Sequence, residues 1–223
     1  MTVAAVILSA TAEGSLADAL GQPGVRRLAD LAWAGGALPI VVVSPDPDGG
    51  VAAALTGSEA SLGSPAPESS GPVGQMVRGV DLAILAVGET SAALLWPGRM
   101  AWVGPETVTS LIEAHGLDPD AVLRPTWHGE PGWPVLLPIS RLDALRAVAP
   151  DLMPPDVIDD LVARATSRLV ELGDPGVVHA VDTPYADLPP YEGPPEPAAG
   201  HHHEWGADVA ADAGLPEPEP SAG

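Results

Sequence analysis

The stretch VAAVILSATAEGSLADALGQPGVRRLADLAWAGGALPIVVVS, residues 3–44, contains two short apolar runs on either side of a segment with helical spacing. The runs Val3–Leu8 and Pro39–Ser44 are rich in β-branched residues, which is typical of buried strands of a parallel sheet. Between them, apolar residues recur at mostly helical spacing from Leu16 to Trp33, around an irregular Gly-Gln-Pro-Gly break. Strand, helix and strand in this order predict a βαβ unit and therefore an α/β fold.

The chain continues this alternation beyond residue 44. A Ser-, Pro- and Gly-rich segment from Gly57 to Gly71 predicts a loop or an eroded edge strand. Between Met76 and Val87 the apolar residues fall at helical offsets, so we predict a helix there rather than a strand. Pro105 opens a further helix that we expect to end just before Gly116. The remaining expected elements are extended segments at 92–96, 122–126, 135–137 and 177–181 and helices at 141–148 and 156–168. This order predicts a doubly wound α/β domain.

The composition limits the chemistry of the protein. The 223 residues include no Phe and no Cys, and neither Lys nor Asn occurs in the sequence. The core must therefore be built mainly from Ala, Val, Leu and Ile. The absence of Cys excludes disulfides, thiolate nucleophiles and Cys-ligated metals, and the absence of Lys excludes a Schiff base or a lysine clamp on phosphate.

A formal net charge of −21 argues against binding to nucleic acid or to an anionic membrane, because both need a basic surface. The N-terminal residues lack the basic region of a signal peptide, and no apolar run reaches the about 20 residues that span a bilayer. We therefore expect a cytoplasmic protein with no nucleic-acid or membrane partner.

The C-terminal part differs in composition from the rest of the chain. Residues 189–223 are acidic and Pro-rich, and such a segment buries too little apolar area to offset the entropy of ordering. We predict one domain over residues 1–188 and a disordered tail over 189–223. The tail contains His201, His202 and His203, which could bind a transition metal, although we favour weak, adventitious binding.

Four segments occur in an order that matches a known family: AAVILSATAEGSL at 4–16, GPVGQM at 71–76, ALLWPGRMAWVGPETVTSLI at 93–112 and GDPGVVHAVDTPYADL at 173–188. Together with GWPVLL at 132–137, they resemble the MobA/MocA-like NTP transferases, which attach GMP or CMP to molybdopterin. The resemblance covers roughly residues 3–188. It implies a three-layer, Rossmann-like nucleotidyltransferase fold in which helices flank a mixed, mainly parallel sheet. The nucleotide would lie at the carboxyl ends of the first strands.

The resemblance also implies site residues, although it assigns no catalytic one. The implied nucleotide-binding residues are Leu8, Ser9, Ala10, Thr11, Gly14, Gly71, Pro72 and Arg99. The implied substrate pocket consists of Gly132, Trp133 and Pro134, and the implied metal ligand is Asp182. Trp133 replaces a family His and could stack on a base or a pterin, or it could simply belong to the core.

The phosphate-binding part departs from the family pattern. Nucleotidyl transfer needs backbone N–H groups close to the phosphates and cations on the triphosphate. Ala10 and Thr11 replace the two glycines of the family loop, for which Gly14 is a partial substitute. The family's Arg and Lys fall near Ser15 and Leu20, so both of these cations are missing.

The metal-binding part departs as well. Arg99 stands where the family has the Asp of its Asp-x-Pro motif, and an Arg repels Mg²⁺, although it can pair with a phosphate directly. Asp182 remains from a pair of acids whose first member is now Ala180, and it is either a metal ligand or an ordinary N-cap. Arg26 and Arg27 lie close in sequence to the phosphate-binding segment. They could supply its missing positive charge from a shifted position, or they could form a solvated helix face.

We therefore favour a degenerate family member that binds a nucleoside triphosphate or a molybdopterin-like ligand without turnover, or that serves as a protein partner in cofactor assembly. One alternative is an active transferase that uses Mg²⁺ at a rearranged metal site drawn from acids such as Glu89, Glu106 or Asp174. Another is a structural protein that acts through its acidic tail. No cofactor is expected unless the chain is active.

Overall fold

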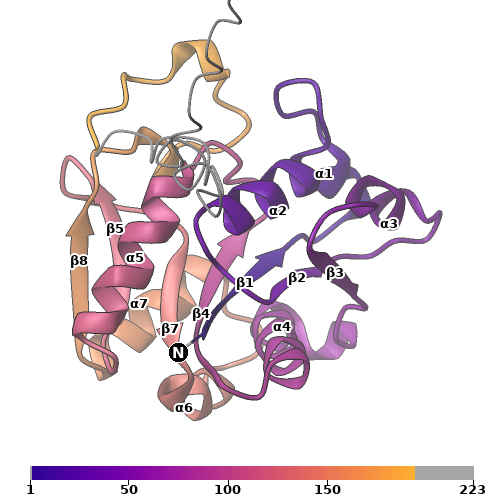
Figure 1. Ribbon diagram of the computed structural model, residues 1–223. Coiled ribbons are helices and arrows are strands. Elements are labelled where there is room, and N and C mark those ends of the chain that lie inside the picture. Colours follow the sequence, from indigo (N-terminus) through magenta and orange to yellow (C-terminus); the bar gives the residue numbers. More distant parts are fainter. Residues whose placement is uncertain (1, 194–223) are drawn as a thin grey trace, which may run out of the picture.

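A computed structural model of the chain describes residues 2–193. The part of the predicted tail beyond residue 193, with His201–His203, lies outside the described residues. An eight-stranded sheet forms the middle of three layers (Figure 1). The strands follow the order β3 (Ala60–Gly63), β2 (Ile40–Val43), β1 (Thr2–Leu8), β4 (Thr90–Pro97), β7 (Val135–Pro138), β5 (Val122–Trp127) and β6 (Glu130–Pro131), with β8 (Ser167–Glu171) paired to β5.

The strands β1 to β4 are parallel to one another, whereas β7 is antiparallel to both β4 and β5. Strand β8 is parallel to β5. The carboxyl ends of β1, β2, β4, β5 and β8 therefore meet at one edge of the sheet, where ligands bind in open α/β folds. The prediction of a mixed, mainly parallel sheet is confirmed.

Two helical layers cover the faces of the sheet (Figure 1). The helices are α1 (Ala12–Leu16), α2 (Gly24–Ala34), α3 (Gly50–Leu55), α4 (Gly71–Ala86), α5 (Pro105–Leu117), α6 (Leu142–Arg146) and α7 (Pro154–Arg164). Side chains alternate along β1, so that Val3, Ala5 and Ile7 share a core with α2, α3 and α5. Ala4 and Val6 point to the other face and share a core with α4, α6 and α7. No helix within residues 2–193 is long and apolar enough to cross a membrane.

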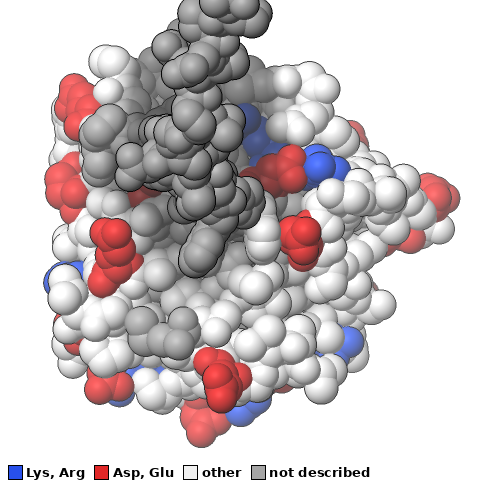
Figure 2. Space-filling model, viewed as in Figure 1, with Lys and Arg blue, Asp and Glu red and all other residues white. Residues whose placement is uncertain are grey.

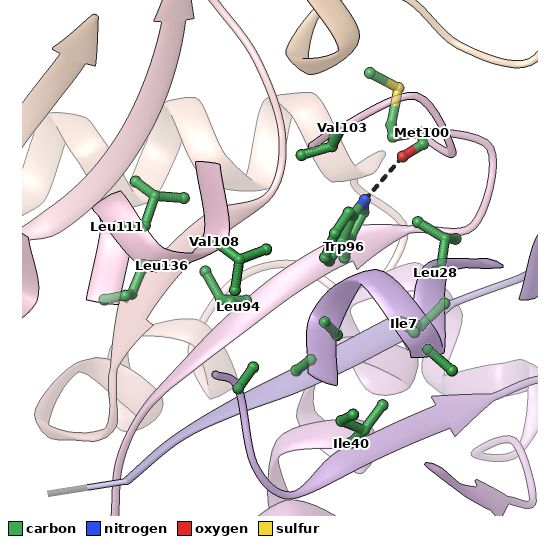
Figure 3. Packing of buried hydrophobic residues seen from close by; sticks show 14 of the residues in the cluster. Ile7, Leu28, Ile40, Leu94, Trp96, Met100, Val103, Val108, Leu111 and Leu136 are labelled. Atoms are coloured by element: carbon green, nitrogen blue, oxygen red, sulfur yellow. Dashed lines mark hydrogen bonds between the residues drawn. The ribbon is translucent and has the colours of Figure 1, made fainter. Parts of the chain in front are cut away.

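Trp96 is the largest fully buried side chain of the described residues, in a core that must do without Phe. It packs among aliphatic side chains from strands and helices, as Figure 3 shows for Ile7, Leu28 and Leu94. Its indole N–H donates a hydrogen bond of 2.9 Å to the carbonyl oxygen of Met100. The aromatic ring at the end of β4 thus also fixes the loop that follows the strand.

The helix expected between Leu16 and Trp33 is shorter than predicted. α1 ends at Leu16, and α2 begins only at Gly24, after the break. Leu20 lies in the connecting loop with a φ of 60°, and its side chain is exposed. The apolar spacing was therefore misleading here, because Leu16 and Leu20 belong to no buried helical face.

The structure also corrects the C-terminal elements. The helix expected at 156–168 ends at Arg164, and residues 167–171 form β8 because they pair with the buried strand β5. The strand expected at 177–181 is absent from the described fold. A short 3₁₀-helix, Pro175–Val177, lies there instead, capped by the Asp174 carboxylate. Helix α3 was not expected, whereas β3 confirms an edge strand within 57–71.

Candidate functional site

The candidate site lies at the carboxyl ends of β1, β2 and β4. The Ser9 N–H donates to the carbonyl of Val43 at 3.0 Å, and the Gly98 N–H donates to that of Leu8 at 2.7 Å. These bonds tie the three strand ends together. A Cβ at Gly98 would lie 2.2 Å from the Ser9 hydroxyl oxygen, so a larger residue there would force that hydroxyl to move. The predicted residues Leu8 and Ser9 thus lie beside the loop that carries Arg99.

The loop after β1 uses its polar groups within the protein. Thr11 caps α1, and its hydroxyl accepts the Gly14 N–H at 3.0 Å. Ser15 is completely buried, and its hydroxyl lies 2.7 Å from that of Ser44, which follows β2. Because Ser15 points into the protein, this position could not present a cation to a phosphate. Ala10 and Thr11 themselves are exposed.

The two basic residues at the start of α2 hold neighbouring parts of the protein. Arg26 pairs with Asp30 at 2.9 Å, one helical turn away. The Arg27 Nε donates to the carbonyl of Ala101 at 2.9 Å, and its guanidinium lies 5.9 Å from the ring centroid of Trp102. Neither residue fits the expected alternative of a purely solvated face, because both are half-buried. Arg26 thus contacts its own helix, and Arg27 links α2 to the loop between β4 and α5.

Arg99 and Asp182 form an ion pair at this edge, with the Arg99 Nη2 and the Asp182 Oδ1 3.0 Å apart. Their side chains are 63% and 72% exposed, respectively. The hydrogen bond from Arg99 lowers the pKa of Asp182 below its ordinary value. Asp182 is not the N-cap of the 3₁₀-helix that follows it, Tyr185–Asp187, because Pro184 takes that place.

The residues around this pair do not fit a divalent cation. Residues 2–193 contain no group of three His, Asp or Glu side chains arranged to hold a metal. Asp182 already accepts from a guanidinium, and the positive charge of Arg99 would repel a cation bound beside it. The implied metal ligand is therefore present as a residue but engaged in an ion pair.

The Asp174 carboxylate is engaged in hydrogen bonds within the protein. Its Oδ2 accepts from the Gly104 N–H at 2.8 Å and from the Thr107 hydroxyl at 2.7 Å. Its Oδ1 accepts from the Gly176 N–H at 2.8 Å, and the side chain is buried. The carboxylate thus joins the C-terminal segment to the start of α5. The sequence signal for this role was the Asp-Pro-Gly pattern of an N-cap.

The other two acids considered for a rearranged metal site lie apart from the ion pair. Glu89 is exposed in the turn just before β4, at the opposite edge of the sheet. Glu106 is buried in the first turn of α5. Neither acid joins Asp182 in a group that could hold a metal within the described residues.

Trp102 holds the segment that carries Asp182. Its indole N–H is shared between the carbonyls of Ala180 at 3.0 Å and Thr183 at 2.9 Å. The Tyr185 ring packs edge-on against it, with the ring centroids 5.4 Å apart. No signal in the sequence indicated this contact between distant segments.

The predicted pocket residues form close contacts within the protein. The backbone N–H of Trp133 donates to the Val177 carbonyl at 2.8 Å, and a Cβ at Gly132 would lie 2.2 Å from that carbonyl oxygen. Trp133 is half-buried and packs against the cores on both faces of the sheet, with a cis peptide bond to Pro134. The geometry of this segment thus serves the packing of β7.

Gly71 and Pro72 form the start of α4. Gly71 has a φ of 59°, which favours glycine, and a Cβ there would lie 2.0 Å from the carbonyl oxygen of Pro150. Pro72 occupies the first turn of the helix. The glycine is therefore required where α4 packs on the loop between α6 and α7.

A cavity of about 480 Å³ lies beyond the carboxyl ends of β5 and β8. It is lined by His128, Glu171, Leu172, Gly173, Glu192 and Gly193, none of which was predicted as a site residue. The Glu171 carboxylate accepts from the Thr126 hydroxyl and from the N–H groups of His128 and Gly129. The Thr126 hydrogen bond, followed by those from the backbone, lowers the pKa of Glu171. With two carboxylates and no Arg in its lining, this cavity is unsuited to phosphate.

The formal charge of the chain, −21, is visible on the surface (Figure 2). Acidic side chains are spread over the face shown, with basic side chains close to some of them (Figure 2). A polyanionic ligand would therefore meet general repulsion and would need a local cation. Arg99 is such a cation at the candidate site, since its side chain is largely exposed.

The model of the MobA-like NTP transferase domain family matches residues 13–169. No curated protein matches the chain. The fold is similar to that of Mycobacterium tuberculosis Rv0371c in complex with manganese, with a TM-score of 0.60, 15% identity and coverage of 77% of this chain and 89% of the other. A Methanothermobacter nucleotidyl transferase gives a TM-score of 0.57, 17% identity and coverage of 76% and 87%. CMP:2-keto-3-deoxy-manno-octonic acid synthetase in complex with CTP gives a TM-score of 0.55, 17% identity and coverage of 83% and 95%.

The match includes some of the predicted site residues and leaves out others. Arg99 and the segment Gly132–Pro134 lie inside residues 13–169. The loop Ser9–Thr11 precedes the match, and Asp174 and Asp182 follow it. The family relationship therefore rests on the middle of the chain, whereas the ion pair joins a matched residue to one outside the match.

Proposed function

Because the chain belongs to the MobA-like NTP transferase family, we propose that it binds a nucleoside polyphosphate at the carboxyl ends of β1, β2 and β4 without catalysing metal-dependent nucleotidyl transfer. The ligand would lie beside Ser9 and Gly98, with a phosphate on Arg99. This edge is where nucleotides bind in open α/β sheets.

The observation that carries the proposal is the ion pair of 3.0 Å between Arg99 and Asp182. Nucleotidyl transfer draws several kcal/mol of transition-state stabilisation from a metal that holds the α-phosphate and the attacking oxygen. A guanidinium at the metal position repels that cation and engages the one family carboxylate that remains. The same guanidinium can bind a phosphate through two parallel hydrogen bonds, so affinity for phosphate can persist where metal binding is lost.

The resemblance of the four segments to the molybdenum-cofactor enzymes supports a role in the assembly of that cofactor. We propose that the second ligand, if there is one, is a molybdopterin-like compound, and that the protein acts as a binder or as a partner of another enzyme in cofactor assembly. The crowded surroundings of Trp133 argue against a role for that indole as an open stacking surface.

An active transferase with a rearranged metal site is the second candidate. It is favoured by the mycobacterial relative, which was solved in complex with manganese. For this candidate, Asp182 would have to leave Arg99 and join further acids. The arrangement of Asp174 opposes it, because both oxygens of that carboxylate already accept hydrogen bonds.

Calorimetry with GTP and with CTP, with and without Mg²⁺, tests the proposal on the full chain. We expect at least one nucleotide to bind with an affinity that Mg²⁺ changes by less than about twofold. The variant Arg99→Gln should bind about tenfold or more weakly, since a hydrogen bond to a charged group contributes about 1.5–3 kcal/mol. Binding that requires Mg²⁺, or no binding of either nucleotide, would overturn the proposal.

A further inference from the structure

Residues 178–188, which we call the strap, run across the loop between β4 and α5. They are held on both sides of Asp182. The Val181 N–H donates to the carbonyl of Arg99 at 2.9 Å, and the carbonyl of Thr183 accepts from the Trp102 indole at 2.9 Å. Because both of its neighbours are fixed to this loop, Asp182 is presented directly to the Arg99 side chain.

The contact made by Asp182 is weak enough to exchange. Both side chains are more than half exposed, and exposed ion pairs contribute little because water and salt screen them. The hydrogen bond engages one terminal nitrogen of a guanidinium that carries five N–H donors. A polyphosphate offers several oxygens and more charge than a single carboxylate, so it can replace Asp182 on Arg99.

We propose that Asp182 is a built-in competitor that occupies the anion site on Arg99, and that a bound polyphosphate displaces it. The proposal rests on the proposed function, since it concerns the same site, and it adds a mechanism that restrains binding. Only the Asp182 side chain must move, because the strap has separate anchors at Trp102 and Tyr185. The site is therefore a metal-free anion receptor that selects ligands by charge.

The structure offers a matched control for this mechanism. Asp187 is an exposed carboxylate on the same strap, five residues from Asp182. Asp182→Asn and Asp187→Asn remove the same charge from the same segment of the full chain. Only the first removes the competitor, so a difference between the two variants measures competition at Arg99 rather than the general loss of negative charge.

Inorganic tripolyphosphate, titrated by calorimetry at fixed ionic strength, is the probe. We expect Asp182→Asn to bind it about two- to fivefold more tightly than the wild type, within the range that an exposed ion pair can contribute. Asp187→Asn should stay within about 1.5-fold of the wild type. In an Arg99→Gln background the gain from Asp182→Asn should disappear, because the anion site itself is lost.

Equal affinities of Asp182→Asn and Asp187→Asn for tripolyphosphate would overturn the proposal that Asp182 competes for Arg99. A gain from Asp182→Asn that persists without Arg99 would overturn it as well. In both cases, nucleotide binding by the wild type would leave the proposed function standing. If neither the wild type nor Asp182→Asn binds tripolyphosphate, GTP or CTP, both the competitor and the proposed function fail.

Discussion

The hydroxyl oxygens of Ser15 and Ser44 lie 2.7 Å apart inside the protein and join the end of α1 to the residue that follows β2. The resemblance implied a phosphate-binding Arg near the position of Ser15, yet the Ser15 side chain is fully buried. A cation at this position would thus conflict with the packing of α1.

Ser15→Arg should therefore fail to restore phosphate affinity. We expect it to lower the free energy of unfolding by about 3 kcal/mol or more, because it places a charge in the interior, whereas Ser15→Ala should lower it by about 1 kcal/mol. Urea denaturation monitored by circular dichroism measures both. A stable Ser15→Arg variant with tighter nucleotide binding would show that this position faces the ligand.

Asp174→Ala should destabilise the fold strongly. The buried carboxylate accepts from Gly104, Thr107 and Gly176, and its removal leaves these donors without their acceptor. We expect a loss of about 3 kcal/mol or more in the free energy of unfolding. The exposed Asp187→Ala should change it by less than about 0.5 kcal/mol. Similar denaturation midpoints for the two variants would refute the structural role of Asp174.

Trp102→Phe should loosen the strap without unfolding the domain. The change keeps an aromatic ring beside Tyr185 but removes the indole N–H that is shared by Ala180 and Thr183. The backbone N–H of Val181 donates to the carbonyl oxygen of Arg99. Its hydrogen should then exchange about tenfold faster, because the free energy of local opening falls by about 1–1.5 kcal/mol. Trp33→Phe, at an exposed position, is the control. Unchanged exchange at Val181 in Trp102→Phe would count against this anchor.

His115 should make stability depend on pH. The side chain is buried in α5, and this burial lowers the pKa of His115, against the opposing effects of Asp118 and Asp120. The unfolded chain therefore takes up a proton at a higher pH than the fold does, and stability should fall as the pH drops below about 6.5, the ordinary pKa of histidine. As the pH is lowered from 7.5 to 5.5, the urea concentration at the unfolding midpoint should fall less steeply for His115→Gln than for the wild type. Parallel slopes for the variant and the wild type would contradict this.

Much of the sheet could be predicted from the sequence because buried parallel strands are short, continuous apolar runs. Val3–Leu8 and Pro39–Ser44 correspond to β1 and β2 in this way. β8 could not be recognised, since four of its five residues are exposed and the strand exists only through its pairing with β5. The same limit applies to Val177, whose apolar neighbours suggested a strand but which lies in a 3₁₀-helix capped by Asp174.

The candidate site was predictable only in part. The order of the motifs indicated that Arg99 and Asp182 belong to one region, and the structure brings them into contact. The contacts of Trp102 and the cavity beside Glu171 join segments that are distant in the sequence, so neither local spacing nor residue type could reveal them. The comparison with the family pattern indicated that a cation is missing near Ser15, but the burial of Ser15 follows only from the tertiary structure.

Pyrophosphate release tests the central claim that the ion pair of Arg99 and Asp182 replaces a working metal site. The full chain is incubated with GTP or CTP, with Mg²⁺ or Mn²⁺, and with and without molybdopterin, next to an active enzyme of the family. We predict no metal-dependent release above background, far below a typical kcat of about 10 per second. Robust release that requires the metal would contradict the account and would mean that Asp182 leaves Arg99 to bind a cation.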